Sequence, residues 1–350
     1  MRALVCAVLM ASSAACGSGP AAPDGPAPDA TLTPVAATAD WPASTPEAEG
    51  LDRARLGDLA LRIRRGDYGR MHSLLIARNG RLAVEDYFSG WSAAQPHTMQ
   101  AVSKSVTSLL VGLAVQAGRM RATDPVTGFF PSYAPLANFD GMKAAMTVND
   151  MLTMRSGLAW QESSYPGSPL QQLNDCRCDW LRFVLDWPMR ETPGTRWEYV
   201  SGATILLGGI VGSATGARLD QFADTALFGP LGATGAYWAR GLPDGLPHAG
   251  GGLYMRPRDM AKIGVLAADG GRWQGTQIVN ASWIAATTAP VARGVRSWGG
   301  RTFDYGGGWW MCEYDGTTVI AASGARGQWI FAVPRDSLVV ALKLTGFRRR

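Results

Sequence analysis

Lysine and histidine are both scarce in this chain of 350 residues. Lysine and arginine together number 33, but only four are lysines, and there are three histidines, His72, His97 and His248. The histidines lie far apart in the sequence and lack the spacing of metal ligands, so neither a metal site nor a cofactor is expected. The net charge of +5 comes from scattered arginines. The one dense run, 348–350, is expected to be a solvated tail, which argues against nucleic-acid binding.

The chain also lacks a long apolar run. No segment after the first residues approaches the roughly 20 apolar residues that a membrane span needs. Residues 1–16 have the form of an export signal, with Arg2 before a short apolar run and a small-residue region. Cys16 follows Ser13-Ala14-Ala15, which resembles a bacterial lipoprotein cleavage box. We expect an exported bacterial protein, periplasmic or anchored in the membrane only through a lipid on Cys16; plain secretion is the alternative.

Cysteine is rare as well, with five in the chain. Two of them belong to the export signal or its edge, which leaves Cys176, Cys178 and Cys312. Export permits a disulfide. Cys176 and Cys178 are too close in sequence to pair comfortably with each other, so either is expected to pair with Cys312. Three unpaired thiols are an equal alternative.

The composition, 47% hydrophobic and 17% charged, predicts a globular protein. Residues 17–43 are rich in proline, alanine, aspartate and threonine, and are predicted to form a flexible tether. The folded domain is expected over residues 44–346.

The periodicity of the domain indicates an α+β fold, with an antiparallel sheet flanked by helices. Helices are expected over 51–65, 101–117, 180–185, 203–211 and 221–228, with others after the Thr147 cap and after Gly252. Strands are expected over 73–78, 81–88, 308–314, 318–323, 328–334 and 337–344. The first two strands are joined by Asn79-Gly80, which suits a type I′ turn. Loops are expected over 129–134 and 160–180.

One stretch, residues 100–112, carries the main chemical signal. Val102, Val106 and Leu109 recur at the spacing of one helix face, and Lys104 lies in the first turn. A desolvated lysine can lose its proton and act as a base, which arginine cannot do. A solvated surface lysine is the alternative for Lys104 considered alone.

The stretch resembles the first motif of serine β-lactamases, penicillin-binding proteins and their esterase relatives, Ser-x-x-Lys at the start of a buried helix. Three residues before Lys104 stands Ala101, where the family has its nucleophile. A second segment, 197–202, resembles the family's Tyr-x-Asn or Tyr-x-Ser motif and supplies Tyr199 and Ser201. A third, 322–331, resembles the glycine-rich strand of the esterase and 6-aminohexanoate-oligomer hydrolase branch.

This resemblance, which spans residues 45–345, implies a β-lactamase/transpeptidase-like fold with a mainly helical subdomain. In intact relatives, it implies that the lysine takes the proton of the serine and that the tyrosine, held partly as phenolate by the ammonium, protonates the leaving group. Carried over, Lys104 and Tyr199 hold these roles. The backbone amides of Ala101 and Ala325 are the implied oxyanion donors. Ser323, Gly324 and Ser201 complete the implied substrate strand and pocket.

A methyl group at position 101 can neither attack a carbonyl nor carry an acyl chain. The sequence therefore predicts a serine hydrolase scaffold, built for ester or amide hydrolysis, that binds a small ester, amide or peptide but is inactive or nearly so. Lysine is absent from the third motif, which argues against β-lactams as substrates. One alternative is a substitute nucleophile, Ser105 or less favourably Ser103. The other is a non-catalytic envelope module that binds cell-wall peptides or a partner protein.

Overall fold

The computed structural model describes residues 32–239 and 245–345. The predicted export signal, Cys16 and the arginine run at 348–350 lie outside the described residues. Within the described ranges, no helix combines the length and apolar character needed to cross a membrane.

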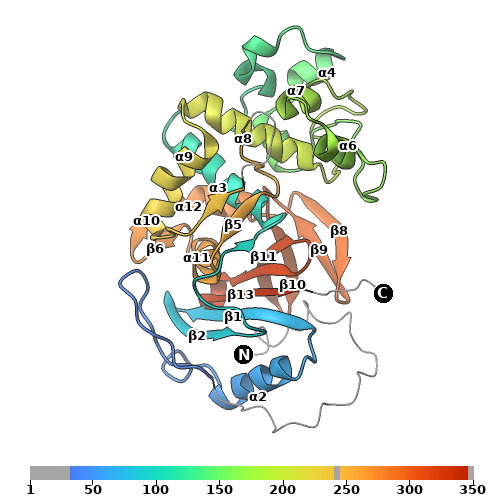
Figure 1. The fold of residues 1–350 in the computed structure, drawn as a ribbon. Helices are drawn as coiled ribbons and strands as arrows, with labels where there is room; N and C mark the ends of the chain where they lie inside the picture. Colours follow the sequence, from blue (N-terminus) through green and yellow to red (C-terminus); the bar gives the residue numbers. More distant parts are fainter. Residues whose placement is uncertain (1–31, 240–244, 346–350) are drawn as a thin grey trace.

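An antiparallel sheet of eight strands forms the centre of the fold, in the order β2-β1-β13-β12-β11-β10-β9-β8 (Figure 1). The strands are β1 Arg70–Arg78, β2 Arg81–Tyr87, β8 Ala292–Trp298, β9 Arg301–Tyr305, β10 Trp310–Tyr314, β11 Thr317–Gly324, β12 Gln328–Val333 and β13 Leu338–Thr345. Two small sheets accompany it, β3 His97–Thr98 with β5 Leu253–Met255 and β4 Tyr237–Trp238, and β6 Arg272–Trp273 with β7 Thr276–Gln277. The last strand in the sequence, β13, pairs with the first strand, β1.

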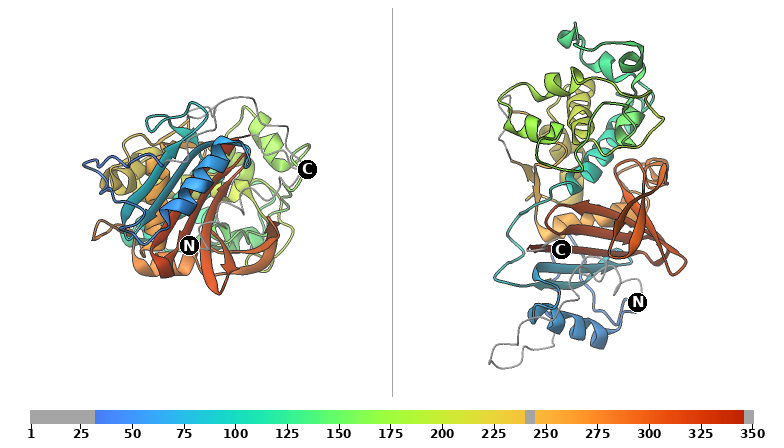
Figure 2. Two further views of the ribbon diagram at one scale, coloured as in Figure 1. Left: turned by 90° about the horizontal axis from the view of Figure 1, so that it is seen from below. Right: turned by 90° about the vertical axis from the view of Figure 1, so that its right-hand side faces the viewer.

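Helices cover the sheet and form a separate cap above it (Figure 2). They are α2 Arg53–Arg64, α3 Val102–Gln116, α4 Gly141–Ala145, α5 Val148–Leu152, α6 Pro169–Asp175, α7 Trp180–Leu185, α8 Ser201–Thr215, α9 Leu219–Ala223, α10 Gly229–Leu231, α11 Pro257–Ala268 and α12 Ala281–Thr287. Short helical turns occur at η1 Val126–Phe129, η2 Pro131–Tyr133, η3 Asp224–Phe228 and η4 Pro334–Asp336. Figure 1 shows α4, α6, α7 and α8 together at one end, with α3 between them and the sheet. The α+β prediction with a mainly helical subdomain is confirmed.

Local sequence signals account for most of these elements. Asn79 and Gly80 have φ of 52° and 73°, as a type I′ hairpin turn requires. The Thr147 side chain caps α5 in a capping box with Asp150. Helix α3 begins at Val102, and 13 of its 15 residues are buried. The predicted hairpin, capped helix, central helix and four C-terminal strands are therefore confirmed.

Other elements differ from the prediction. Helix α6 lies inside the segment expected to be irregular, where Ser168 caps it and Pro169 takes the first helical position. Strands β8 and β9 were not predicted. Their residues are mostly partly or fully exposed at the sheet edge, so they lack an apolar alternation. The expected loop at 129–134 begins at the last residue of the 3₁₀ turn η1 and contains the 3₁₀ turn η2.

The predicted tether is wrong for residues 32–43, because this segment packs against the domain. Leu32 and Trp41 are buried, and the Trp41 indole N–H donates to the carbonyl of Gly80 at 3.0 Å. Asp40 pairs with the fully buried Lys262 at 2.6 Å. Two apolar anchors and one ion pair are enough to order a segment whose average composition looks disordered.

We expect Asp40→Asn to lower the free energy of unfolding at pH 7 by about 1 kcal/mol, since the Asp40 carboxylate is about one-third exposed. Burial by itself raises the pKa of Asp40, but the hydrogen bond and charge of Lys262 lower it to about 2. The carboxylate therefore stabilises the fold above the unfolded pKa of 3.8, and this contribution disappears as pH falls through 2. Urea titrations from pH 2 to pH 7 measure it, with Asp58→Asn as an exposed control. A difference between wild type and variant that does not depend on pH would contradict the assignment.

The disulfide differs from the expectation too. Cys176 and Cys178 pair with each other, and their Cα atoms lie 5.3 Å apart. That separation is in the ordinary range for a disulfide, because the chain is extended at Cys176 where α6 ends. Cys312 is buried in β10 and lies outside this pair.

Candidate active site

The start of α3 places residue 101 beside the end of strand β11. Gln100 has φ of 49°, and this left-handed turn leads into Ala101 at the N-cap of the helix. A methyl group added at Gly324 would lie 2.3 Å from the carbonyl oxygen of Met99, so the strand end presses directly against this turn. The structure therefore packs Met99 and Gln100, the two residues just before Ala101, against Gly324.

Lys104 points into the interior, and its ammonium nitrogen donates to the carbonyl of Gly250 at 2.9 Å. Burial lowers its pKa to about 8, and the negative charge of Glu162 opposes this shift. A methyl group added at Gly250 would lie 3.5 Å from Lys104 Nζ and 3.4 Å from the carbonyl oxygen of Ser201. The alternative of a solvated surface lysine is wrong, and Lys104 is poised to lose its proton near neutral pH.

Tyr199 lies beside this lysine, but its expected partial ionisation is wrong. The Lys104 ammonium sits 5.0 Å from the centre of the Tyr199 ring, over the ring face. Burial raises the pKa of Tyr199 well above its usual value, and Tyr305 and Glu162 add to the rise. The phenol is therefore neutral, so it can donate a proton or a hydrogen bond.

Glu162 was missed by the sequence analysis. Its carboxylate accepts three hydrogen bonds, from the Ser201 hydroxyl at 2.6 Å, the Ser201 backbone N–H at 2.9 Å and the Trp160 indole at 2.6 Å. Ser201 is the first residue of α8, so the carboxylate also faces the positive end of that helix. No motif marks Glu162, because it lies in a loop and is brought to Ser201 only by the tertiary fold.

His248 is another residue that the sequence left unassigned. A methyl group added at Gly250 would lie 3.4 Å from the His248 ring and 3.5 Å from Lys104 Nζ, so both side chains border this glycine. Burial and the charge of Lys104 lower the pKa of His248 to about 4. The imidazole is therefore neutral at pH 7.

The two serines considered as substitute nucleophiles are both buried. The Ser105 hydroxyl donates to the carbonyl of Gly308 at 2.7 Å, and the Ser103 hydroxyl accepts from the backbone N–H of Leu253 at 3.3 Å. The expectation that the helix is buried at Ser105 is confirmed. Each hydroxyl is engaged with the backbone of a neighbouring segment, the loop at Gly308 or the start of β5, so neither is placed to attack a ligand.

The third motif occupies the end of β11 and the turn that follows it. Ser323 and Gly324 are the last strand residues, whereas Ala325 is exposed in the turn before β12. Arg326 and Gly327 continue this turn with φ of 70° and 92°. Ala325 therefore follows the strand, and the oxyanion role of its amide remains a prediction.

We expect Gly324→Ala to lower the free energy of unfolding by about 1–3 kcal/mol, because the added methyl group must push the Met99 carbonyl away. The same shift would displace residue 101 from the strand end. Thermal melting measures the loss of stability. Gly141→Ala is the control, since a methyl group there meets nothing within 4 Å. Equal melting temperatures for the two variants would contradict this packing.

An aromatic wall borders Tyr199. The ring of Tyr199 stacks on Trp310 at 5.9 Å, and Tyr305 meets Trp310 edge-on at 4.7 Å. The Arg296 guanidinium lies over Trp298 at 4.5 Å and over Tyr199 at 6.0 Å. Apart from Tyr199, these residues come from β8, β9 and β10, so the wall depends in part on β8 and β9, which the sequence did not predict.

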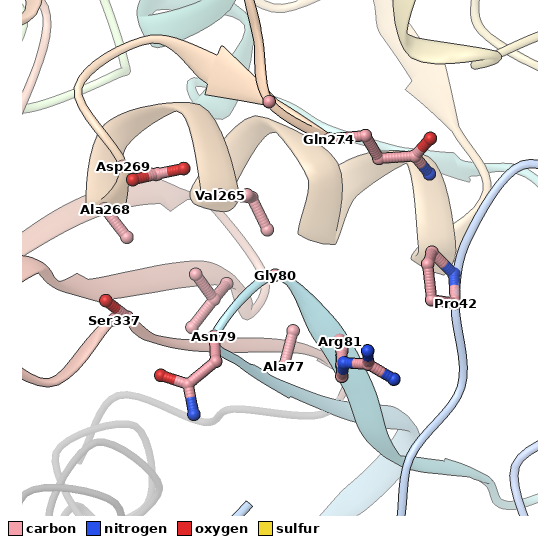
Figure 3. Close-up of a pocket in the computed structure, with 12 residues that line it drawn as sticks. Pro42, Ala77, Asn79, Gly80, Arg81, Val265, Ala268, Asp269, Gln274 and Ser337 are labelled. Atoms are coloured by element: carbon pink, nitrogen blue, oxygen red, sulfur yellow. The ribbon is translucent and has the colours of Figure 1, made fainter.

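A pocket of about 510 Å³ lies elsewhere, between the β1–β2 hairpin and α11. Figure 3 shows Asn79, Arg81 and Asp269 around it. A second pocket, of about 320 Å³, follows α8 at Gly208 and Gly212. Neither of these two pockets is lined by any of the predicted site residues. Neither is therefore the candidate site, which we place at Ala101 and Lys104.

Comparison with known proteins agrees with this arrangement. Residues 69–349 match the Beta-lactamase family. The chain is 27% identical over 332 residues to the 6-aminohexanoate-dimer hydrolase of Paenarthrobacter ureafaciens, covering 89% of this chain and 82% of that protein.

Solved structures share the fold. One is a Bacillus anthracis protein provisionally named a 6-aminohexanoate-dimer hydrolase (TM-score 0.69, 18% identity, 91% of this chain and 84% of that one). Another is a family VIII carboxylesterase (TM-score 0.65, 19% identity, 83% and 90%). The family match covers most of the chain, which therefore belongs to the Beta-lactamase family.

Proposed function

We propose that this protein binds a small ester, amide or peptide in a serine-hydrolase pocket and does not form an acyl-enzyme. The observation that carries the proposal is the position of Ala101, at the start of α3, one turn before the buried Lys104 and against the end of β11. This is the position from which a hydroxyl would be activated. The methyl group there has no proton to transfer and no electron pair to donate.

The rest of the site retains groups that a hydrolase uses. Lys104 is neutral in a substantial fraction of molecules near pH 8, and the neutral Tyr199 can protonate a leaving group. The backbone amides of Ala101 and Ala325 are unaffected by the loss of a side-chain hydroxyl. Loss of the nucleophile alone typically costs about a millionfold in kcat, and leaves roughly a thousandfold over water from binding and oxyanion donors.

The aromatic wall supports a ligand with an apolar or planar part. Tyr199, Trp197 and Trp298 are only partly buried, so their rings can contribute apolar area to an adjacent ligand. We propose that the ligand is a small molecule met outside the cytoplasm, with the protein exported and, through Cys16, lipid-anchored.

Two measurements on the wild-type protein test the proposal. Saturation-transfer NMR with a short aliphatic amide should detect binding, and a variant that fills the space at residue 101, Ala101→Trp, should lose it. Intact-mass spectrometry after exposure to a fluorophosphonate should show no adduct. A covalent adduct on the wild type, or identical NMR signals for both proteins, would overturn the proposal.

A further inference from the structure

A row of residues crosses four strands of the central sheet at the level of the candidate site. Gly324 on β11 pairs with Gln328 on β12, Gln328 pairs with Lys343 on β13, and Lys343 pairs with Ser73 on β1. Residues directly opposite each other in an antiparallel sheet project to the same face. Because a methyl group at Gly324 would meet the Met99 carbonyl, the segment that leads into Ala101 covers this face.

The covered row is polar. Lys343 is 3% exposed and Gln328 is fully buried. Within the described part of the chain, neither the amide nitrogen nor the amide oxygen of the Gln328 side chain has a hydrogen-bond partner. Buried amides in native proteins are nearly always hydrogen-bonded, so this pair of open positions indicates a missing partner.

Two histidines join the row from neighbouring elements. The rings of His72 on β1 and His97 on β3 lie 5.4 Å apart, and Trp91 stacks against both, at 4.4 and 4.1 Å. Although isolated in sequence, these histidines are therefore neighbours in space. His72 Nε2 shares a hydrogen bond of 2.8 Å with the Thr345 hydroxyl. His72 Nδ1 and His97 Nε2 are buried and have no hydrogen-bond partner among the residues that the structure describes.

The cluster of His72, His97, Gln328 and Lys343 carries positive charge that no described carboxylate neutralises. Among residues 32–239 and 245–345, no carboxylate forms an ion pair with Lys343. The positive charge of Arg326 repels it. Burial and Arg326 lower the pKa of Lys343 to about 8, so the lysine is mostly charged at pH 7.

The two imidazoles add no positive charge to that of Lys343. Burial lowers the pKa of both His72 and His97 to about 4, and the charge of Lys343 acts on both in the same direction. Arg70 adds a further positive influence on His72. A neutral imidazole still carries one N–H donor, and the Gln328 amide carries two. The cluster thus combines one cation with several neutral donors.

We infer that the cluster of His72, His97, Gln328 and Lys343 binds a small monoatomic anion, such as chloride, beneath the segment 97–100. The ammonium supplies the charge, and the amide and imidazole N–H groups supply donors. Burial to 3% or less leaves no route for a large ligand, and a single cation matches a single negative charge. The bound anion would hold residues 97–100 against the sheet and so fix the start of α3.

Thermal melting of the full chain at pH 7 tests the inference. Sodium chloride is titrated against sodium gluconate at equal ionic strength, because gluconate is too large for the cluster. Chloride should raise the melting temperature to a plateau. The response should persist in the exposed-charge control Arg119→Gln and disappear in Lys343→Met. Crystals soaked in bromide should give an anomalous peak within reach of Lys343 Nζ.

Gln328→Glu provides a second variant that does not remove the lysine. It supplies a carboxylate opposite Lys343, so it should raise the melting temperature in gluconate and abolish the chloride response. Equal effects of chloride and gluconate on the wild type, as a water-filled cluster would give, overturn the inference. So does a chloride response that survives in Gln328→Glu, a lower melting temperature of that variant in gluconate, or no bromide peak. If Lys343→Met does not fold, Gln328→Glu decides alone.

Discussion

The Ala101→Ser variant should hydrolyse a short-chain nitrophenyl ester at least about a thousandfold faster than the wild type, since removing the nucleophile of such a unit costs up to about a millionfold. The new hydroxyl would lie at the N-cap of α3, one helical turn from the buried Lys104. Lys104 can accept its proton because burial lowers the lysine pKa to about 8. Initial rates with both purified proteins measure the gain.

The control is the double variant Ala101→Ser, Lys104→Met, which has the hydroxyl but no base. It should fall most of the way back to the wild-type rate, because an unassisted serine is a weak nucleophile near pH 7. Labelling by a fluorophosphonate should follow the same order. If Ala101→Ser folds but gains neither labelling nor turnover, the assignment of residue 101 as the nucleophile position is wrong.

The second large effect that we expect is on the pH dependence of ester hydrolysis by Ala101→Ser. In Ala101→Ser, only neutral Lys104 can act as the base, so the rate should rise about tenfold per pH unit below pH 8 and level off above it. Between pH 6 and pH 8 this amounts to a rise of about fiftyfold. The pKa of Tyr199 lies well above this window, so its phenol stays protonated throughout. Initial rates from pH 5.5 to pH 9.5 give the midpoint.

Two companion variants separate Lys104 from other titrating groups. Glu162→Gln removes a negative charge that raises the pKa of Lys104, so the midpoint should move to lower pH. Lys104→Arg keeps the charge but cannot deprotonate in this range, so its rates should be low and free of this pH dependence. A midpoint that stays at the same pH in Glu162→Gln would show that another group controls the profile.

Local sequence patterns were sufficient to predict the parts of the fold that depend on neighbouring residues. The period of Val102, Val106 and Leu109 predicted α3, and Asn79-Gly80 predicted the hairpin turn. The three-residue spacing between Ala101 and Lys104 predicts that residue 101 is the nucleophile position, which remains a proposal. Each of these features depends on backbone geometry within one or two turns of the chain. The local sequence is therefore enough to predict it.

Local patterns failed where the outcome depended on distant packing. The composition of residues 32–43 predicted a tether. The Trp41 side chain is nevertheless buried, and its indole N–H donates a hydrogen bond to the carbonyl of Gly80. A lysine beside a tyrosine suggested a phenolate, but the ammonium lies over the ring face and burial keeps the phenol neutral.

The amino-acid sequence by itself determined the family, the order of the three motif-like segments and the alanine at position 101, since these are properties of residue identity and short spacing. The tertiary structure alone decided that Glu162 meets Ser201, that Arg296 overlies Tyr199, and that Gln328 and Lys343 stand opposite each other beneath residue 99. Those contacts depend on strand register and on burial. Both arise only when segments far apart in the chain exclude water from one another.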